Sequence, residues 1–287
     1  YFPNVVLEDA TINNYFETYV YCYSNATLKL VNVNGTWENR RPWRIYLYDG
    51  FRLAEINNSK IEYVYIGSYS GGTLKIFNST ISSIDTSWST YTNSTIFLRK
   101  AYVNWMYLHG SVSMICENST VGALDLYDNS SATLCNYTTM GIFTSHFNIY
   151  GNNYIVVNGS QIVSNETSSP QVFCDETSKI EQQEVAIYLH ENAYGELINA
   201  NIDRICCYGL SGLNATNTTV YWVEVHSDGS LRFESCTINN IEASWHGDAV
   251  LILYNSNISG IWTWSDGWEN LTLIVKWSYV DWLRLFG

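Results

Sequence analysis

The residues of this chain that could carry chemistry are few and stand apart from one another. Four short groups combine a histidine or a carboxylate with a second polar or small residue: His109-Gly110, His246-Gly247-Asp248, Asp125/Asp128 and Asp175/Glu176. Paired carboxylates could hold a hard cation, and an imidazole near a carboxylate could take part in acid/base chemistry. Solvated surface turns have the same composition, so these groups by themselves favour the structural interpretation.

No established catalytic motif accompanies these groups. The chain contains no nucleophile-elbow serine, phosphate-binding loop, HExxH zinc motif or EF-hand loop. We therefore predict that the protein is not an enzyme, and we assign no catalytic, cofactor-binding or metal-ligating residue.

A repeat along the chain predicts the elements that position these side chains. Its clearest copy is 74–84, where Leu74 and Ile76 alternate with polar residues, Asn78 follows, and Ile81 and Ile84 come after it. Alternation is typical of a half-buried strand, and Asn-Ser-Thr is turn chemistry. The pattern is therefore strand, corner, strand.

Copies of this pattern recur roughly every 18–26 residues, a period typical of a solenoid. The better copies begin at Val5, Ala54, Met114, Leu197, Leu213, Leu231, Leu251 and Leu273. The interval 159–196 is about twice the period and holds either a degenerate coil or an inserted loop. No window has the apolar spacing of an amphipathic helix.

Short strands without helices, closing about three sides per coil, resemble the right-handed parallel β-helix family that includes pectate lyases, polygalacturonases and phage tailspikes. We therefore predict an all-β fold, a right-handed single-stranded β-solenoid of about 12–14 coils forming one domain over 1–287. Coils about 4.8 Å apart would give a rod on the order of 60 Å long.

The composition narrows the classes of partner. The net charge of −13 argues against binding of nucleic acid, which requires a basic surface. The sequence also contains no run of about 20 apolar residues, the length needed to span a membrane. About 14 Asn-x-Ser/Thr sequons, against roughly five or six expected from composition, indicate an exported protein carrying N-linked glycans at the cell surface. The alternative is that the repeat itself uses Asn-Ser-Thr as a turn.

The position of each sequon in the repeat separates two roles. Corner asparagines have the parity of the inward apolar residues, and we expect them to stack inside as a ladder: Asn78, Asn118, Asn136, Asn158 and Asn217. The remaining candidates for glycosylation are Asn25, Asn93, Asn129, Asn270, Asn34, Asn165, Asn214 and Asn257.

The seven cysteines fit an exported protein and show no metal-binding spacing. Cys116 falls on an inward position and is expected in the core. The candidates for disulfides are Cys22, Cys135, Cys174, Cys206, Cys207 and Cys236, with Cys135 and Cys236 expected to face outward.

The resembled lyases and galacturonidases use carboxylates on neighbouring coils of the outer sheet face. On the first strand of each repeat, the outward carboxylates here are Glu8, Glu55, Glu117 and Glu234, and no two fall on adjacent coils. The polygalacturonase motifs are missing. The resemblance therefore covers the architecture of the chain and does not extend to catalytic residues.

Aromatic residues are in surplus, with 11 Trp and 23 Tyr. Outward parity is expected for Trp88, Trp105, Trp245, Trp262, Trp264 and Trp282. Such rings could form a protein interface, bind sugar, or pack along the flanks of the rod.

Neither predicted end of the rod carries a polar cap, and an open coil exposes unpaired backbone groups and core side chains. We expect copies of this chain to join head to tail, without cofactor, into a filament, sheath or surface layer similar in style to archaeal cell-surface glycoproteins. The expected interface residues are Val5, Leu7, Trp262, Trp264, Trp282, Leu283 and Phe286. The alternative is a carbohydrate-binding adhesin or polysaccharide-degrading enzyme on the same scaffold.

Overall fold

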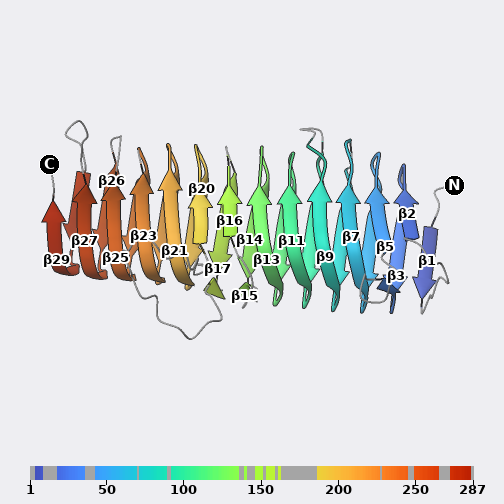
Figure 1. Ribbon diagram of the computed structural model, residues 1–287, viewed down its shortest axis with the longest axis horizontal. Coiled ribbons are helices and arrows are strands. Elements are labelled where there is room, and N and C mark those ends of the chain that lie inside the picture. Colours follow the sequence, from blue (N-terminus) through green and yellow to red (C-terminus); the bar gives the residue numbers. More distant parts are fainter. Residues whose placement is uncertain are drawn as a thin grey trace, which may run out of the picture.

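A computed structural model describes residues 4–8, 18–35, 43–69, 71–88, 92–135, 139–140, 146–150, 153–158, 161–162, 186–226, 228–244, 249–264 and 272–285. The described chain is all β and winds into a parallel β-solenoid (Figure 1). The β1 and β29 ends lie at opposite ends of its long axis. The fold prediction is confirmed.

The first sheet contains 13 parallel strands, one from each coil. Its strands are β1 (Asn4–Glu8), β3 (Thr27–Val31), β6 (Leu53–Asn57), β8 (Thr73–Phe77), β10 (Thr95–Arg99), β12 (Ser113–Glu117), β14 (Ser131–Cys135), β17 (Tyr154–Asn158), β20 (Tyr194–Ile198), β22 (Gly212–Thr216), β24 (Ser230–Glu234), β26 (Val250–Tyr254) and β28 (Thr272–Lys276). Each pairs in register with the strand one coil away.

The second sheet contains 16 strands. Its main path is β2 (Thr18–Cys22), β5 (Trp43–Leu47), β7 (Lys60–Ile66), β9 (Thr80–Thr86), β11 (Tyr102–Leu108), β13 (Thr120–Leu126), β16 (His146–Ile149), β19 (Ala186–Leu189), β21 (Asn201–Tyr208), β23 (Thr219–His226), β25 (Thr237–Ser244), β27 (Asn257–Trp264) and β29 (Tyr279–Leu285). Three short strands lie off it, namely β4 (Asn34–Gly35), β15 (Thr139–Met140) and β18 (Gln161–Ile162).

The long strands of the second sheet bend at their third residue. Between β7 and β9 the pairing passes from Ile61↔Ile81 to Tyr63↔Ser83, and the residues between are left out of the ladder. Two consecutive positions of β9, Ser82 and Ser83, are only half-buried there, which breaks the alternation. The interruption divides the strand into two segments, and Ile81 and Ile84, on either side of it, are both buried.

The long interval at 159–196 holds no additional coil. Strand β17 pairs directly with β20, so the two belong to neighbouring coils. Strand β18 pairs with the start of β21 and β19 with its end, so together they replace one bent strand. The extra residues, 163–185, lie between β18 and β19 and outside the described residues.

The core follows the repeat. Leu74, Ile76, Ile81 and Ile84 have no exposed surface, and the equivalent positions of the neighbouring coils are also buried. A continuous apolar column therefore runs along the axis of the solenoid. Its burial is the main favourable contribution to folding, roughly 25 cal/mol per Å² of apolar surface removed from water.

The corner between the two sheets corrects one prediction. Asn78, Asn118 and Asn217 were expected inside, yet their side chains are exposed, and each has a φ between 46° and 50°. A left-handed residue interrupts the alternation of the strand, so the following Ser or Thr turns inward instead. Asn136 lies outside the described residues, and the side chain of Asn158 is likewise not described.

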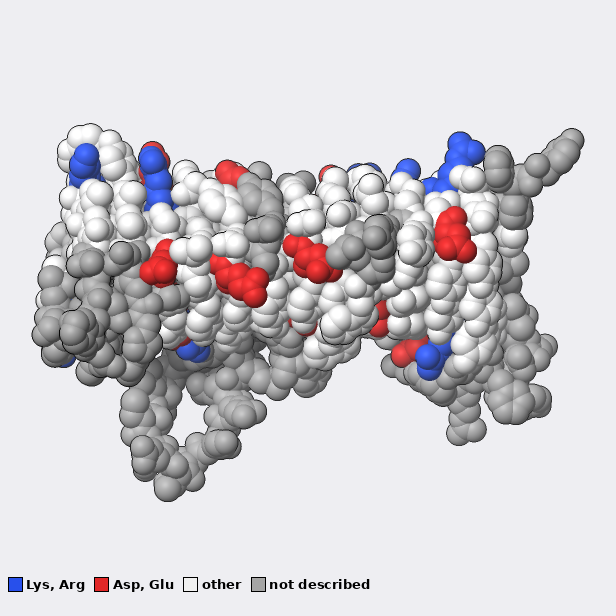
Figure 2. Space-filling model, turned by 90° about the horizontal axis from the view of Figure 1, so that it is seen from above, with Lys and Arg blue, Asp and Glu red and all other residues white. Residues whose placement is uncertain are grey.

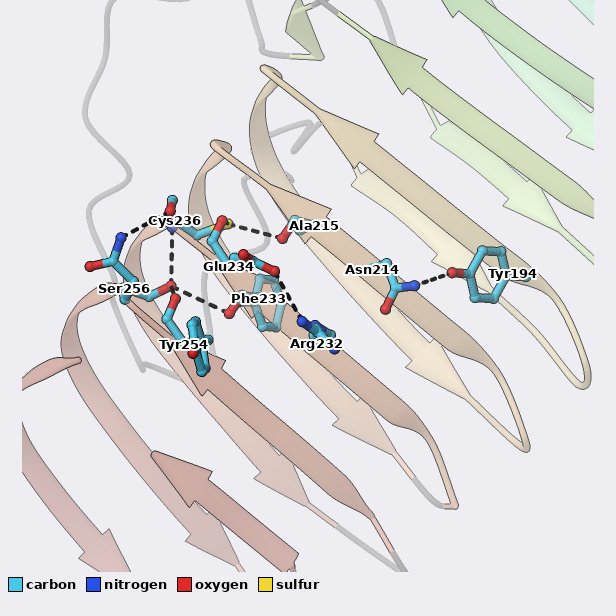
Figure 3. A network of polar contacts seen from close by, with 11 residues as sticks. Tyr194, Asn214, Ala215, Arg232, Phe233, Glu234, Cys236, Tyr254 and Ser256 are labelled. Carbon is cyan, nitrogen blue, oxygen red and sulfur yellow. Dashed lines mark hydrogen bonds and ion pairs between the residues drawn. The ribbon is translucent and has the colours of Figure 1, made fainter. Parts of the chain in front are cut away.

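The inward corner residue forms the ladder that was expected of asparagine. Ser79 Oγ accepts a hydrogen bond from Ser59 N at 3.0 Å and donates one to Phe77 O at 2.7 Å. Ser256 does the same for Cys236 N, at 3.0 Å, and Tyr254 O, at 2.9 Å (Figure 3). Asparagines form a second ladder outside, where Asn217 Nδ2 donates to Asn199 Oδ1 at 2.7 Å.

Left-handed backbone at the corner predicts a difference between two substitutions of Asn58, whose φ is 50°. Both Asn58→Val and Asn58→Gly remove its 2.6 Å side-chain bond to Asn32. Only valine opposes the left-handed conformation, so Asn58→Val should be less stable than Asn58→Gly by about 1–2 kcal/mol. Denaturant unfolding measures the difference, and equal free energies of unfolding for the two variants would contradict it.

Candidate functional site

The outward face of the second sheet, beyond the bend, carries the side chains that best define a functional surface. One register position runs through all thirteen coils, and we call it the central column. Its residues are Tyr21, Tyr46, Tyr65, Asp85, Tyr107, Asp125, Asn148, Tyr188, Cys206, Glu224, Glu242, Trp262 and Arg284. Three tyrosines begin this column, aromatic and polar residues are mixed in the middle coils, and two glutamates follow Cys206.

Tyrosines gather on the first two coils of this face. Tyr19, Tyr21 and Tyr23 on the first coil lie against Tyr46 and Tyr48 on the second. The ring centroids of Tyr21 and Tyr46 are 5.1 Å apart, and those of Tyr23 and Tyr48 are 5.3 Å apart. The rings of the first coil have exposed fractions near one half, 52% for Tyr21, because only one side of each is covered by a neighbouring coil.

A column next to the central column forms a continuous ring stack over the middle coils. Six rings from successive coils belong to it: His109, Tyr127, Tyr150, His190, Tyr208 and His226. Neighbouring centroids lie 4.2–5.0 Å apart, and neighbouring planes are within 11° of parallel. Trp88, which is 84% exposed, covers the His109 end at 4.3 Å.

The stack determines what these rings can bind. Each inner ring has both faces against neighbouring rings, and a sugar platform needs a free face. The stack therefore contributes to holding coils together rather than to binding a ligand through ring faces. Trp88 alone in this stack has a ring largely open to solvent.

Burial shifts the pKa values within the stack. Loss of hydration, with a smaller effect of the Asp125 charge, raises the pKa of Tyr127 to about 12. Loss of hydration likewise raises the pKa of Tyr208 to about 12, with Cys206 and Glu224 adding to it. Burial lowers the pKa of His109 and His190, partly offset by Asp128 and Glu191 respectively. These shifts favour the neutral forms of Tyr127, Tyr208, His109 and His190.

A polar cluster follows the stack on coils β21 to β25. The Glu224 carboxylate accepts a hydrogen bond from Arg204 Nη2, lies 3.2 Å from His226 Nε2, and accepts one from Cys206 Sγ at 3.5 Å. Burial by itself would raise the pKa of Glu224, but the bonds from His226 and Arg204 outweigh it and lower the value to about 2. The side chain is therefore a carboxylate at neutral pH.

Glu242 is the register partner of Glu224 on the next coil. Parallel strands lie about 4.8 Å apart, so the two glutamates occupy the same register position on adjacent coils of the second sheet. Trp222 and Trp262, with centroids 5.0 Å apart, stand beside them. Sequence analysis of the first strands missed this pair, although the separation of 18 residues between Glu224 and Glu242 equals one coil.

On the first sheet, the predicted outward carboxylates stand on separate coils, and Glu196 of β20 is a further one that the prediction missed. Glu55 lies 3.4 Å from Lys29, and Glu234 lies 3.0 Å from Arg232 (Figure 3). On the face drawn in Figure 2, charged side chains stand singly or in small groups separated by uncharged surface. Among the described residues, no group of three or more His, Cys, Asp or Glu side chains is arranged to hold a metal ion.

Of the short acidic and histidine groups of the sequence, the structure brings two together, since His109 Nδ1 lies 3.9 Å from Asp128 Oδ2. Asp125 is buried and accepts a hydrogen bond from Asn148 at 2.9 Å, whereas Asp128 accepts one from Gly110 N at 2.9 Å. Asp175, Glu176, His246 and Asp248 lie outside the described residues. Within the described ranges, no helix is long and apolar enough to cross a membrane.

The predicted disulfides are corrected for the described cysteines. Within the described part of the chain, no disulfide is formed by Cys22, Cys116, Cys135, Cys206, Cys207 or Cys236, and Cys174 lies outside it. The physical reason is the register, since the described neighbours of each cysteine on adjacent coils are residues of other types. Cys236 was expected outside and is buried, because it occupies the inward corner position, where its Sγ donates to Ala215 O at 3.4 Å (Figure 3).

The described sequon asparagines outside the tight corner are accessible. Exposed side chains belong to Asn25, Asn34, Asn93, Asn129, Asn214 and Asn257. Asn25, Asn93 and Asn129 share one edge of the solenoid, since each lies in a connection from the second sheet to the first. Asn165 and Asn270 lie outside the described residues, and glycosylation of all eight positions stays a prediction.

The described residues expected at the assembly interface fall on the first coil and on the last two coils. Val5 is 42% exposed in β1, and Leu283 is 48% exposed in β29, although Ile261, one coil inward from Leu283, is buried. Trp282 lies over Gly260 and stacks on Trp262 at 5.4 Å. The side chains of Leu7 and Trp264, and all of Phe286, lie outside what the structure describes.

Comparisons with protein-family models, with curated proteins and with solved structures found no match to this chain.

The raised tyrosine pKa values predict how stability changes with alkaline pH. Between pH 10 and 12 an unfolded tyrosine loses its proton while Tyr127 and Tyr208 keep theirs, so folding loses stability as pH rises through this window. The double variant Tyr127→Phe/Tyr208→Phe should unfold at a higher pH than the wild type. Circular dichroism during an alkaline titration measures the midpoint.

The control is Tyr102→Phe, since Tyr102 is exposed and outside the stack. It should leave the alkaline midpoint unchanged. An unchanged midpoint in the double variant would mean that the two stacked hydroxyls do not resist ionisation.

Proposed function

We propose that this protein is a structural subunit of an extracellular, glycosylated filament, sheath or surface layer. The observation that carries the proposal is the ring stack: its inner rings use both faces to join neighbouring coils. A surface organised in this way favours a stiff rod over a ligand-binding groove. The exposed sequon asparagines along one edge fit a face that carries glycans.

Exposed apolar side chains support assembly of such rods. Large exposed residues gather on the two end coils, with Val5, Val6 and three tyrosines at one end. At the other end are Ile274, Val275, Trp277, Tyr279, Trp282 and Leu283. Contact between copies would remove this surface from water, and an exposed cluster of this kind is typical of an interaction site. The partner under this proposal is a further copy of the same chain.

Electron microscopy and light scattering of the native protein, without an added partner, test this function. We expect filaments or a lattice above a threshold concentration, because contacts that do not close into a ring continue indefinitely. Dispersed rods about 60 Å long at every concentration would overturn the structural role. Enzymatic removal of glycans separates an effect of the sugars from one of the polypeptide.

A second candidate function is favoured by one specific observation, the pairing of Glu224 with Glu242 beside Trp222 and Trp262. Carboxyl groups about 5–5.5 Å apart serve retaining glycosidases, and flanking tryptophans bind sugar rings. This arrangement would make the protein a polysaccharide-binding adhesin or a polysaccharide-degrading enzyme.

A panel of neutral and acidic polysaccharides, assayed for binding and for released reducing ends, tests the second candidate. If it holds, Glu224→Gln and Glu242→Gln should each lower cleavage by at least about a hundredfold, as expected for loss of an acid/base or nucleophilic carboxylate. Glu196→Gln, on the first sheet, is the matched control and should retain activity. An inactive wild type, or equal activity in all variants, rejects this candidate.

A further inference from the structure

We propose, resting on the structural function above, that the β1/β2 coil of one copy docks onto the β28/β29 coil of the next copy and continues both sheets in the same register. The partner is a second copy of this chain. The proposal is based on the residues of the two end coils, which are complementary at the positions that share a register column.

The first sheet supplies an apolar match on both of its faces. The inward column that contains Val5 ends at Leu273, and the outward column that contains Val6 ends at Ile274. A next coil in register would therefore place Val5 of one copy against Leu273 of its neighbour, and Val6 against Ile274. Val5, Val6 and Ile274 are exposed in the single chain, and docking would bury them.

The second sheet supplies an aromatic match. The column of Tyr19 ends at Trp282, that of Val20 ends at Leu283, and that of Tyr21 ends at Arg284. Tyr19 would stack on Trp282 and continue the pairing that Trp282 already makes with Trp262. Arg284, now 5.7 Å from the Trp282 ring, would also lie opposite Tyr21, an arrangement that favours a cation–π contact.

Charge agrees with the same register. Position 8 of β1 is a glutamate, and its column ends at Lys276 of β28. Opposite charges directly across two strands contribute roughly 0.2–1 kcal/mol, and like charges destabilise by similar amounts. A next coil in register would therefore set position 8 of one copy opposite Lys276 of its neighbour.

The alternation of inward and outward residues constrains the register between the two copies. A slip by one residue would set the inward Val5 opposite the outward Ile274 and would turn the whole apolar set to the wrong face. The corner also constrains the fit, because Trp277 repeats the left-handed conformation found at Asn255 one coil earlier. Docking of this kind joins unlike surfaces, so it continues into a filament instead of closing.

Two blocking variants test the proposal. Val5→Asp places a charge on the β1 surface, and Val275→Asp, at a position 41% exposed, places one on the β28 surface. Each variant alone should remain monomeric. Their mixture should give dimers and nothing longer, because the intact β28 surface of the first variant still accepts the intact β1 surface of the second.

Analytical ultracentrifugation at matched concentrations distinguishes the outcomes. Tyr221→Asp, a change at an exposed aromatic residue of a middle coil, is the control and should assemble like the wild type. Circular dichroism checks that each variant keeps its fold. If both Asp variants still form filaments, the end-to-end docking is wrong and the structural function stands. If the wild type forms no assembly, both proposals fall.

A charge exchange gives a second test that leaves the core untouched. Lys276→Glu should raise the concentration needed for assembly by on the order of tenfold, since it replaces an attraction by a repulsion. Adding Glu8→Lys to the same chain should restore wild-type assembly. A double variant no better than Lys276→Glu would overturn the proposed register.

Discussion

Parallel pairing of each coil with the next, in one constant register, is the constraint on which the rest of this structure depends. Residues at equivalent positions of adjacent coils lie about 4.8 Å apart. Each side chain must therefore pack against the equivalent side chain of the preceding coil and that of the following coil. Inward columns satisfy this with aliphatic side chains, several of the corners with serine or threonine hydroxyls, and outward columns of the second sheet with rings that stack. The stability of any one coil therefore resides largely in its two interfaces, as expected for a solenoid.

The same constraint relates the surface to the proposed function. A ring whose two faces meet neighbouring rings adds stiffness along the axis and leaves only its edge for a partner. The first coil differs, because a neighbouring coil covers the rings of Tyr19 and Tyr21 on one side only. At the far end of the solenoid, Trp282 occupies the same register column as Tyr19, and Arg284 the same column as Tyr21. Rod formation and rod joining would then use the same side-chain contacts.

The period and the core could be predicted from the sequence, because burial imposes a strict alternation on residues such as Leu74, Ile76, Ile81 and Ile84. The direction of Asn78 could not, since alternation assumes an extended backbone and the left-handed corner reverses the parity. The fates of Cys206 and Cys236 depended on which residues became register neighbours. Insertions at the bend, such as 163–185, obscure that register in the sequence. The pair Glu224 and Glu242 could be predicted, because the two glutamates are one coil apart and have the same position in the second sheet.

The central claim is that coil-to-coil pairing continues from one copy to the next. The axial repeat of the assembled native protein, measured by electron cryomicroscopy, tests it most directly. Thirteen coils at about 4.8 Å each predict a subunit repeat on the order of 62 Å, with an unbroken strand ladder across the boundary between copies. Filaments in which copies lie side by side, or in which a gap interrupts the ladder between β29 and the next β2, would contradict the account.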